Sequence, residues 1–210
     1  MRILLLGATG GSGRAFIDAA LKAGHEVGAL VRGRGRLTAH PGLIEFAGDV
    51  TKPETVEAAI AAFKPEAAVS TLGTRAAESG TLTEVMGPIV ALFEKHGIQR
   101  FIHVSSVGVG DSIGQLGFLA RAIIVPLFLK AALKEKEPQE RAIMASSLEW
   151  TIARPGNLVD EPVLGAWKCV EDTRQNLGRP LVSRTDLAAF MVRELAERSY
   201  LRKAVSLTSP

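Results

Sequence analysis

Short apolar runs alternate with amphipathic stretches along most of the chain. The apolar runs are short enough for strands buried on both faces, and they cover residues 2–6, 26–31, 43–47, 67–71, 100–105 and 150–154. A last apolar stretch at 204–208 predicts one further strand. Repeated strand–helix units of this kind predict an α/β fold with a doubly wound parallel sheet and helices on both of its faces.

The stretches between the strands place apolar residues at helical spacing. They predict helices at residues 14–23, 53–63, 82–96, 118–134, 137–147 and 187–198. Thr51 and Glu54 have the spacing of a capping box for the second helix, Pro138 divides the fourth from the fifth, and Asp186 is expected to open the last.

The 210 residues show no repeat, linker or low-complexity segment. A single domain is therefore expected over residues 1–210. Within it, two portions at about 107–135 and 156–182 are expected to cover a substrate.

The first strand ends in a glycine-rich turn, and a helix is predicted directly after it. Gly7 permits the turn, Gly10 leaves room for a diphosphate against the backbone, and Gly13 lets the helix pack closely on the strand. The order of strand, glycine turn and helix predicts a Rossmann-type dinucleotide site rather than an ordinary glycine-rich turn. The expected contacts from this turn are Gly7, Thr9, Gly10, Gly11, Ser12 and Gly13.

Ligands of doubly wound sheets bind beyond the carboxyl ends of the strands, so the residues that follow each strand are candidates. Arg32 and Arg36 follow the second strand, where a cation suits the 2′-phosphate of NADP and an acidic residue would suit NAD. NADP(H) is therefore predicted in preference to NAD(H), with a solvated basic turn as the structural alternative. Further candidates for cofactor contact after the later strands are Asp49, Val50, Thr71, Leu72, Gly73, Thr74, Arg75, Ser105 and Pro155.

Two of these candidates have equally plain structural interpretations. Asp49 is placed to accept from the adenine amino group, with Val50 against the ring, but it is also a common turn residue. Arg75 either meets a phosphate or an acidic group, or is exposed on a loop.

After the fifth strand, Ser106 is expected to hydrogen-bond a substrate carbonyl, whereas His103 lies within the strand and is expected to serve packing.

Composition narrows the range of partners. Hydrophobic residues make up 47% and charged residues 22%, and the net charge of +3 is spread along the chain, so no nucleic acid partner is expected.

The single cysteine, Cys169, excludes a disulfide within the chain and favours a cytoplasmic location. Arg121, Pro126 and Lys130 interrupt the apolar stretch 116–133, which favours a buried helix or an apolar lid over membrane contact. No metal site is predicted, and the expected state is a monomer or a homodimer.

Six motifs resemble those of the short-chain dehydrogenase/reductase superfamily and occur in its order: GATGGSG, GDV, STLGTR, VSSVG, KEKEPQE and WTIARPGNL. The resemblance covers nearly the whole chain. It is to the atypical branch, in particular the NAD(P)H-binding group of biliverdin-IXβ (flavin) reductases, with NmrA-like proteins as a second relative.

The usual catalytic set of that superfamily includes a tyrosine four residues before a lysine. Lys136, followed four residues later by Glu140, matches the lysine, but Ala132 stands at the tyrosine position. The only tyrosine, Tyr200, is near the C-terminus. The resemblance therefore implies the mechanism of the biliverdin-IXβ reductase group, which works without the Tyr–Lys pair.

A reductase of a conjugated acceptor requires hydride delivery, while solvent supplies the proton. We therefore expect an NADPH-dependent oxidoreductase acting on a flat, apolar small molecule of the flavin, quinone or tetrapyrrole type, with Ser106 and Lys136 as catalytic candidates. A non-catalytic NADP(H) sensor of the NmrA-like type is the alternative. A sugar-nucleotide epimerase or dehydratase is a third, which the short stretch after Gly156 disfavours.

Overall fold

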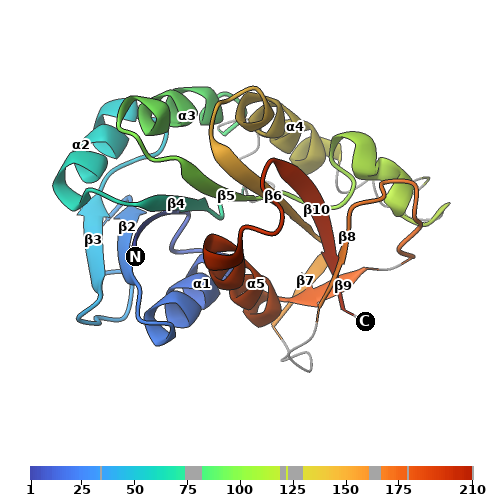
Figure 1. Cartoon of the computed structure of the whole chain (residues 1–210), viewed down its shortest axis with the longest axis horizontal. Coiled ribbons are helices and arrows are strands. Elements are labelled where there is room, and N and C mark those ends of the chain that lie inside the picture. Colours follow the sequence, from blue (N-terminus) through green and yellow to red (C-terminus); the bar gives the residue numbers. More distant parts are fainter. Residues whose placement is uncertain are drawn as a thin grey trace.

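An eight-stranded, mostly parallel sheet forms the centre of the molecule (Figure 1). The computed structural model describes residues 1–33, 35–73, 82–118, 122, 130–160, 167–178 and 180–209. The strands of this sheet are β1 (Arg2–Leu6), β2 (Glu26–Val31), β3 (Leu43–Ala47), β4 (Ala67–Ser70), β5 (Arg100–Val104), β6 (Glu149–Pro155), β8 (Lys168–Val170) and β10 (Lys203–Thr208). Their spatial order is β3-β2-β1-β4-β5-β6-β10-β8, and all neighbours are parallel except β10 and β8. The predicted doubly wound sheet is confirmed, with one antiparallel edge strand that the pattern did not predict.

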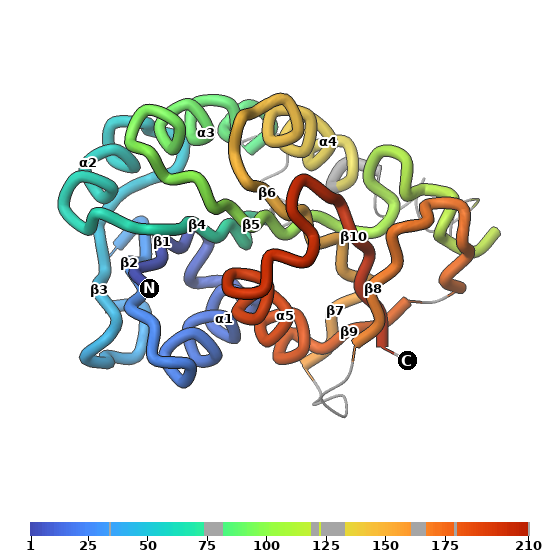
Figure 2. The backbone as a smooth tube through the Cα atoms, in the orientation of Figure 1, coloured from blue at the N-terminus to red at the C-terminus, as the bar shows by residue number. Residues whose placement is uncertain are grey.

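The strand order reverses beside β1. The chain runs outward from β1 to β2 and β3, and then crosses back to β4 on the other side of β1 (Figure 2). Leu6, the last residue of β1, is thus paired with Leu30 of β2 on one side and with Ser70 of β4 on the other. The loops that leave β1 and β4 diverge at this point, which is where such sheets bind ligands.

Helices cover both faces of the sheet (Figure 1). On one face lie α1 (Gly11–Lys22) and α5 (Arg184–Glu197), whose buried apolar side chains share one core with the sheet. On the other lie α2 (Pro53–Phe63), α3 (Met86–Lys95) and α4 (Lys130–Met144), where Phe93 and Phe101 pack edge to face at 5.1 Å. None of the helices in the described part of the chain is both long and apolar enough to cross a lipid bilayer.

The expected bounds of α1, α3, α4 and α5 are wrong, whereas α2 covers residues 53–63 as predicted. Pro138 lies inside α4 instead of dividing two helices, because α4 is held against the sheet by buried residues on both sides of it, Glu135 and Glu140 among them. Most of the predicted helix 118–134 lies outside the described residues. Helix α1 begins at Gly11 rather than at residue 14, since the glycines themselves form its first turn.

The expected capping residues are also wrong. Helix α2 has Lys52 as its N-cap with no side-chain hydrogen bond, and the Thr51 hydroxyl instead donates to Asp49 Oδ1 at 2.9 Å. Helix α5 begins at Arg184 because Ser183 caps it, with the Ser183 hydroxyl accepting from the Asp186 amide at 2.9 Å.

A second, two-stranded sheet was missed by the sequence pattern. It consists of β7 (Asn157–Val159) and β9 (Leu181–Ser183), which pair in parallel. A short 3₁₀ helix, η2 (Gly110–Gln115), follows β5. Strands of three residues are too short for an alternation of polar and apolar positions to be recognised.

Candidate functional site

The glycine turn after β1 has the geometry that a diphosphate requires. Gly7 has a φ of +90°, and a Cβ there would lie 2.8 Å from the Thr71 carbonyl carbon. A Cβ on Gly13 would overlap the carbonyl oxygen of Gly7, so α1 approaches the strand as closely as it does only because that residue is glycine. A Cβ on Gly10 would meet only Gly7 O, at 3.6 Å, and otherwise open space. The space in front of Gly10 therefore fits a cofactor phosphate.

The amino end of α1 is electrically positive and uncapped. Gly10 is its N-cap with no side-chain hydrogen bond, and its first turn has no acidic residue. The first amides of a helix have no partner within it, so they are available to an anion. Arg14 adds a cation and also ties two loops together, since Nε donates to Thr9 O at 3.3 Å and Nη2 to Arg36 O at 2.9 Å. The sequence pattern did not single out Arg14.

Arg32 and Asp49 lie together after β2 and β3. With Gly48, Lys52 and Thr55 they line a depression of about 310 Å³. A hydrogen bond from the Thr51 amide, at 2.9 Å, holds the pKa of Asp49 below its usual value, and the charge of Arg32 acts in the same direction. The depression therefore contains two cationic side chains, Arg32 and Lys52, and one carboxylate, Asp49, which already accepts hydrogen bonds from Thr51.

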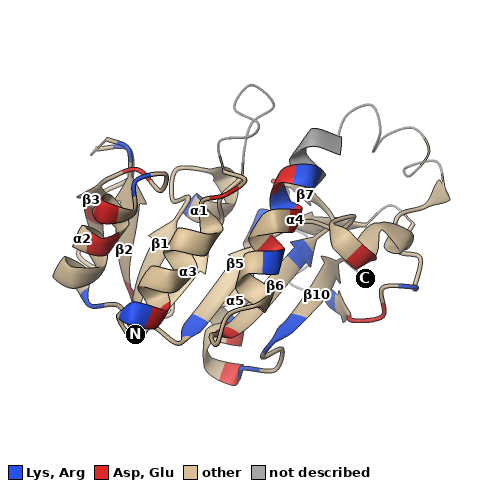
Figure 3. Ribbon diagram, turned by 90° about the horizontal axis from the view of Figure 1, so that it is seen from above, with Lys and Arg blue, Asp and Glu red and all other residues tan. Residues whose placement is uncertain are grey.

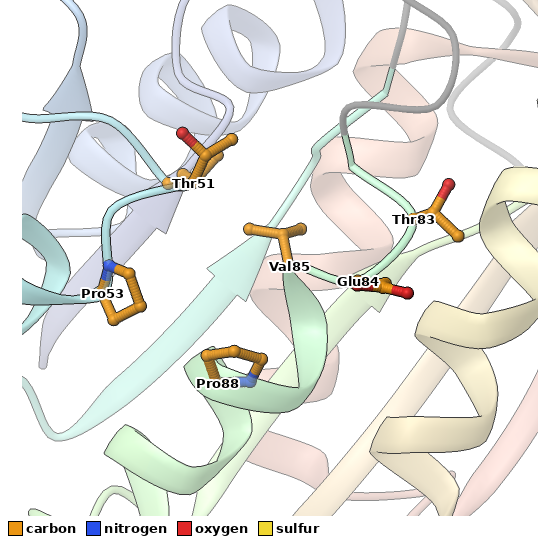
Figure 4. Close-up of a pocket in the computed structure, with 7 residues that line it drawn as sticks. Thr51, Pro53, Thr83, Glu84, Val85 and Pro88 are labelled. Carbon is orange, nitrogen blue, oxygen red and sulfur yellow. The ribbon is translucent and has the colours of Figure 1, made fainter.

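A larger pocket of about 500 Å³ lies beside it, between the β3–α2 connection and the start of α3 (Figure 4). Its lining residues are Val50, Thr51, Pro53, Thr83, Glu84, Val85 and Pro88. The volume is in the range of small-molecule pockets. Val50 thus lines this pocket on its β3–α2 side. The sequence pattern did not predict that Thr83, Glu84 and Val85 form the other side of the pocket. Residues 82–85 were expected to be part of α3, but they precede it.

The residues after β4 close the crevice against the glycine turn. The Thr71 hydroxyl donates to Gly7 O at 3.1 Å, which joins the ends of β1 and β4. Leu72 and Gly73 follow. Thr74 and Arg75, which were also predicted to contact the cofactor, lie outside the described residues.

The side chain of Lys136 extends from α4 to the carboxyl ends of β4 and β5. Its ammonium donates to Leu72 O at 3.2 Å and to Val104 O at 3.1 Å. Burial lowers the pKa of Lys136 to about 8, against the opposing charge of Glu140. The lysine that the superfamily resemblance singled out is therefore at the carboxyl edge of the sheet.

An ion-pair cluster links α4 to β6 and to η2, and two of its three members, Arg154 and Glu140, are buried. Arg154 on β6 donates through Nε and Nη2 to the two carboxylate oxygens of Glu140, at 3.0 and 2.6 Å. Its Nη1 donates to Asp111 of η2 at 2.6 Å. Positive and negative residues are interspersed along α4 (Figure 3). Glu140 is thus paired with Arg154, one helical turn away from Lys136.

The serines after β5 differ in their surroundings. The Ser106 hydroxyl is partly exposed and donates to Val107 O at 3.1 Å. Ser105 is buried, and its hydroxyl has no hydrogen-bond partner in the described part of the chain. Pro155 ends β6 beside them, and its carbonyl accepts from the Val107 amide at 3.0 Å. His103 is fully buried beside Phe101, and burial lowers its pKa well below the usual value, so the ring stays neutral.

Tyr200 belongs to the opposite face of the sheet. It packs beside Phe190 of α5, with ring centroids 6.0 Å apart. Burial, together with a hydrogen bond to Cys169, raises the pKa of Tyr200 to about 12. Tyr200 therefore lies on the other face of the sheet from α4, the helix that carries Lys136.

The described candidates converge on one edge of the sheet, around the point where the strand order reverses. A glycine turn with this geometry at such a point defines a dinucleotide-binding Rossmann protein. The chain belongs to the NAD(P)H-binding family, whose family model matches residues 7–198.

Two curated relatives cover nearly the whole chain. An uncharacterised chloroplastic protein of Arabidopsis thaliana is 26% identical, with 99% of this chain and 76% of that protein aligned. The photosystem II assembly factor Ycf39 of Synechocystis is 25% identical over 97% of this chain. The chain spans only 61% of the length of that second relative.

Solved structures show the same architecture. The anaerobilin reductase ChuY of Escherichia coli O157:H7 is 29% identical, with a TM-score of 0.84 over 100% of this chain and 98% of that one. A short-chain dehydrogenase/reductase of Veillonella parvula in complex with NADP has a TM-score of 0.84 at 20% identity, covering 100% and 94% of the two chains. These likenesses agree with the atypical short-chain dehydrogenase/reductase resemblance found in the motifs.

Proposed function

We propose that the protein is an NADPH-dependent reductase of a flat, conjugated acceptor of the flavin, quinone or tetrapyrrole type. The observation that carries the proposal is Lys136, which lies across the ends of β4 and β5 while Ala132 occupies the usual tyrosine position. A reduction that takes its proton from solvent needs no tyrosine. The 29% identity to an anaerobilin reductase supports this class of reaction.

Each group at the edge of the sheet has a part in this proposal. The bound dinucleotide would supply the hydride. The amino end of α1 would hold the diphosphate, and Arg32 the 2′-phosphate. Lys136 would hold the ribose next to the nicotinamide, and Ser106 would donate to a carbonyl of the acceptor. We assign the cover of the acceptor to portions at about 107–135 and 156–182, which include η2, β7 and β9.

Oxidation of NADPH by the purified protein tests the proposal against FMN, riboflavin, a short-chain quinone, biliverdin and anaerobilin. We expect turnover with one class of acceptor. Ser106→Ala is expected to reduce it about three- to tenfold, the value of one neutral hydrogen bond. Ser147→Ala is the matched control, because its hydroxyl binds Glu94 on the surface and is expected to leave turnover unchanged.

Absence of turnover with every acceptor, with cofactor binding intact, would contradict the reductase. The alternative would then be a non-catalytic NADP(H) sensor, which Ala132 equally permits. A sensor must bind the oxidised and reduced cofactors with different affinities, because only differential binding shifts a conformational equilibrium.

Arg32→Ala is expected to weaken NADPH binding by about 10- to 100-fold and to leave NADH binding nearly unchanged. The reason is the loss of a charge-assisted hydrogen bond to the 2′-phosphate, worth about 1.5–3 kcal/mol. Titration calorimetry with both cofactors measures it, and Arg174→Ala at an exposed arginine is the control. Equal loss for both cofactors would show that Arg32 does not read the 2′-phosphate.

A further inference from the structure

Arg184, the first residue of α5, lies against the first turn of α1. A Cβ built on Gly11 would be 2.7 Å from Arg184 Nε and 2.9 Å from its Cδ. The guanidinium stem therefore occupies the space that any other residue at position 11 would fill. Helices α1 and α5 pack side by side on the same face of the sheet (Figure 1). The contact with Gly11 therefore brings Arg184 next to the glycine turn.

Arg184 lies at a position where helix dipoles disfavour a cation. A cation at the amino end of a helix opposes the helix dipole, and Arg184 stands at the first position of α5 and beside the first turn of α1. Asp186 offsets this for α5, but α1 has no acidic residue in its first turn. In the described part of the chain the only ion-pair partner of Arg184 is Asp160, whose carboxylate is 2.6 Å away and 87% exposed.

We propose that Arg184 is a further cofactor-binding residue, which contacts the diphosphate of the dinucleotide. Asp160, which pairs with the guanidinium at 2.6 Å, would compete with that diphosphate for it. The side chain is one quarter exposed (27%), so it is accessible to a ligand in front of the glycine turn. The inference rests on the cofactor-binding part of the proposed function and is independent of the acceptor.

Two substitutions are expected to act in opposite directions. Arg184→Gln is expected to weaken binding of NADPH and of NADH equally, by about tenfold, because the diphosphate is common to both. Asp160→Asn is expected to tighten binding of both by about two- to fivefold, since it removes the competing carboxylate of an exposed pair. Dissociation constants from titration calorimetry, together with thermal unfolding of each cofactor-free variant, provide the measurement.

The pattern of results separates the possible roles. If Asp160→Asn weakens binding as much as Arg184→Gln does, the pair is only structural and the inference is overturned. Unchanged affinity in Arg184→Gln overturns it as well. Should that variant unfold, Arg184→Lys keeps the charge and must still weaken both cofactors. If the unsubstituted protein binds neither cofactor, the proposed function fails together with the inference.

Discussion

Glu194→Ala is expected to lower the free energy of unfolding by about 3–5 kcal/mol, because it leaves a buried charge without its partner. Arg100 and Glu194 form an ion pair at 3.1 Å, with side chains only 1% and 2% exposed. The same carboxylate accepts from the Thr151 hydroxyl at 3.2 Å and from the Tyr200 amide at 2.9 Å. One side chain thus joins the end of α5 to β5, to β6 and to the turn before β10.

The charge of Arg100 explains why the loss is large. Burial lowers the pKa of Arg100 to about 10, and the Glu194 carboxylate opposes that shift. Without Glu194 the guanidinium remains buried with no carboxylate at its Nη2.

Urea unfolding of the unsubstituted protein and of Glu194→Ala measures the difference in their free energies of unfolding. Glu197→Ala is the matched control on the same helix, because Glu197 pairs with Arg193 at 3.3 Å where both side chains are half exposed. That substitution is expected to cost less than about 0.5 kcal/mol. Equal losses in the two variants would contradict the argument from burial.

The sequence predicted the seven strands of the central sheet that have four residues or more, because each forms an apolar run long enough to be recognised. The runs at 26–31 and 43–47 coincide with β2 and β3 residue for residue. The strands β7, β8 and β9 were missed, because three residues are too few for a strand pattern to be recognised. Pro138 was overvalued as a helix breaker because the burial that stabilises α4 around it is a tertiary effect.

In the candidate site too, local sequence patterns predicted some residues, whereas tertiary contacts determine the others. Positions directly after the strands were predictable, because the carboxyl ends of parallel strands share one edge. Arg14 and Arg184 were not predictable, because the contact of Arg14 with the Arg36 carbonyl and that of Arg184 with Gly11 of α1 do not show in the patterns of their own helices. The bond from Lys136 to Leu72 spans 64 residues, so the motif indicated the residue but not its partner.

Lys136→Met is expected to reduce turnover of the proposed reductase by about 10²–10³-fold, the usual cost of removing one preorganised donor from an active site. The ammonium is held between Leu72 O and Val104 O, at the strand ends where the nicotinamide ribose would lie. Lys134→Met is the control, because Lys134 is exposed on the same helix and is expected to leave turnover unchanged. Steady-state rates with a saturating acceptor measure both variants. A loss of similar size in the two would show that the charge of α4 matters rather than the position of Lys136.

The pKa of Lys136 also predicts how turnover depends on pH. Because that pKa is about 8 in the folded chain and 10.5 ordinarily, Lys136 is charged below about pH 8 and becomes neutral above it. Turnover of the unsubstituted protein is therefore expected to fall as the pH rises through 8, and the profile of Lys136→Met to lack that step.

Stability is expected to change in the opposite direction. Burying the charged lysine costs folding free energy, and this cost is complete below about pH 8. Between about pH 8 and 10.5 the unfolded chain binds the proton that the folded chain has lost, so the free energy of unfolding rises with pH relative to Lys136→Met. Urea unfolding at several pH values measures that slope. Alkaline unfolding would lower turnover and stability together, so only titration of Lys136 explains a loss of turnover that accompanies a gain in stability. Parallel stability profiles of the two proteins would exclude Lys136 as the titrating group.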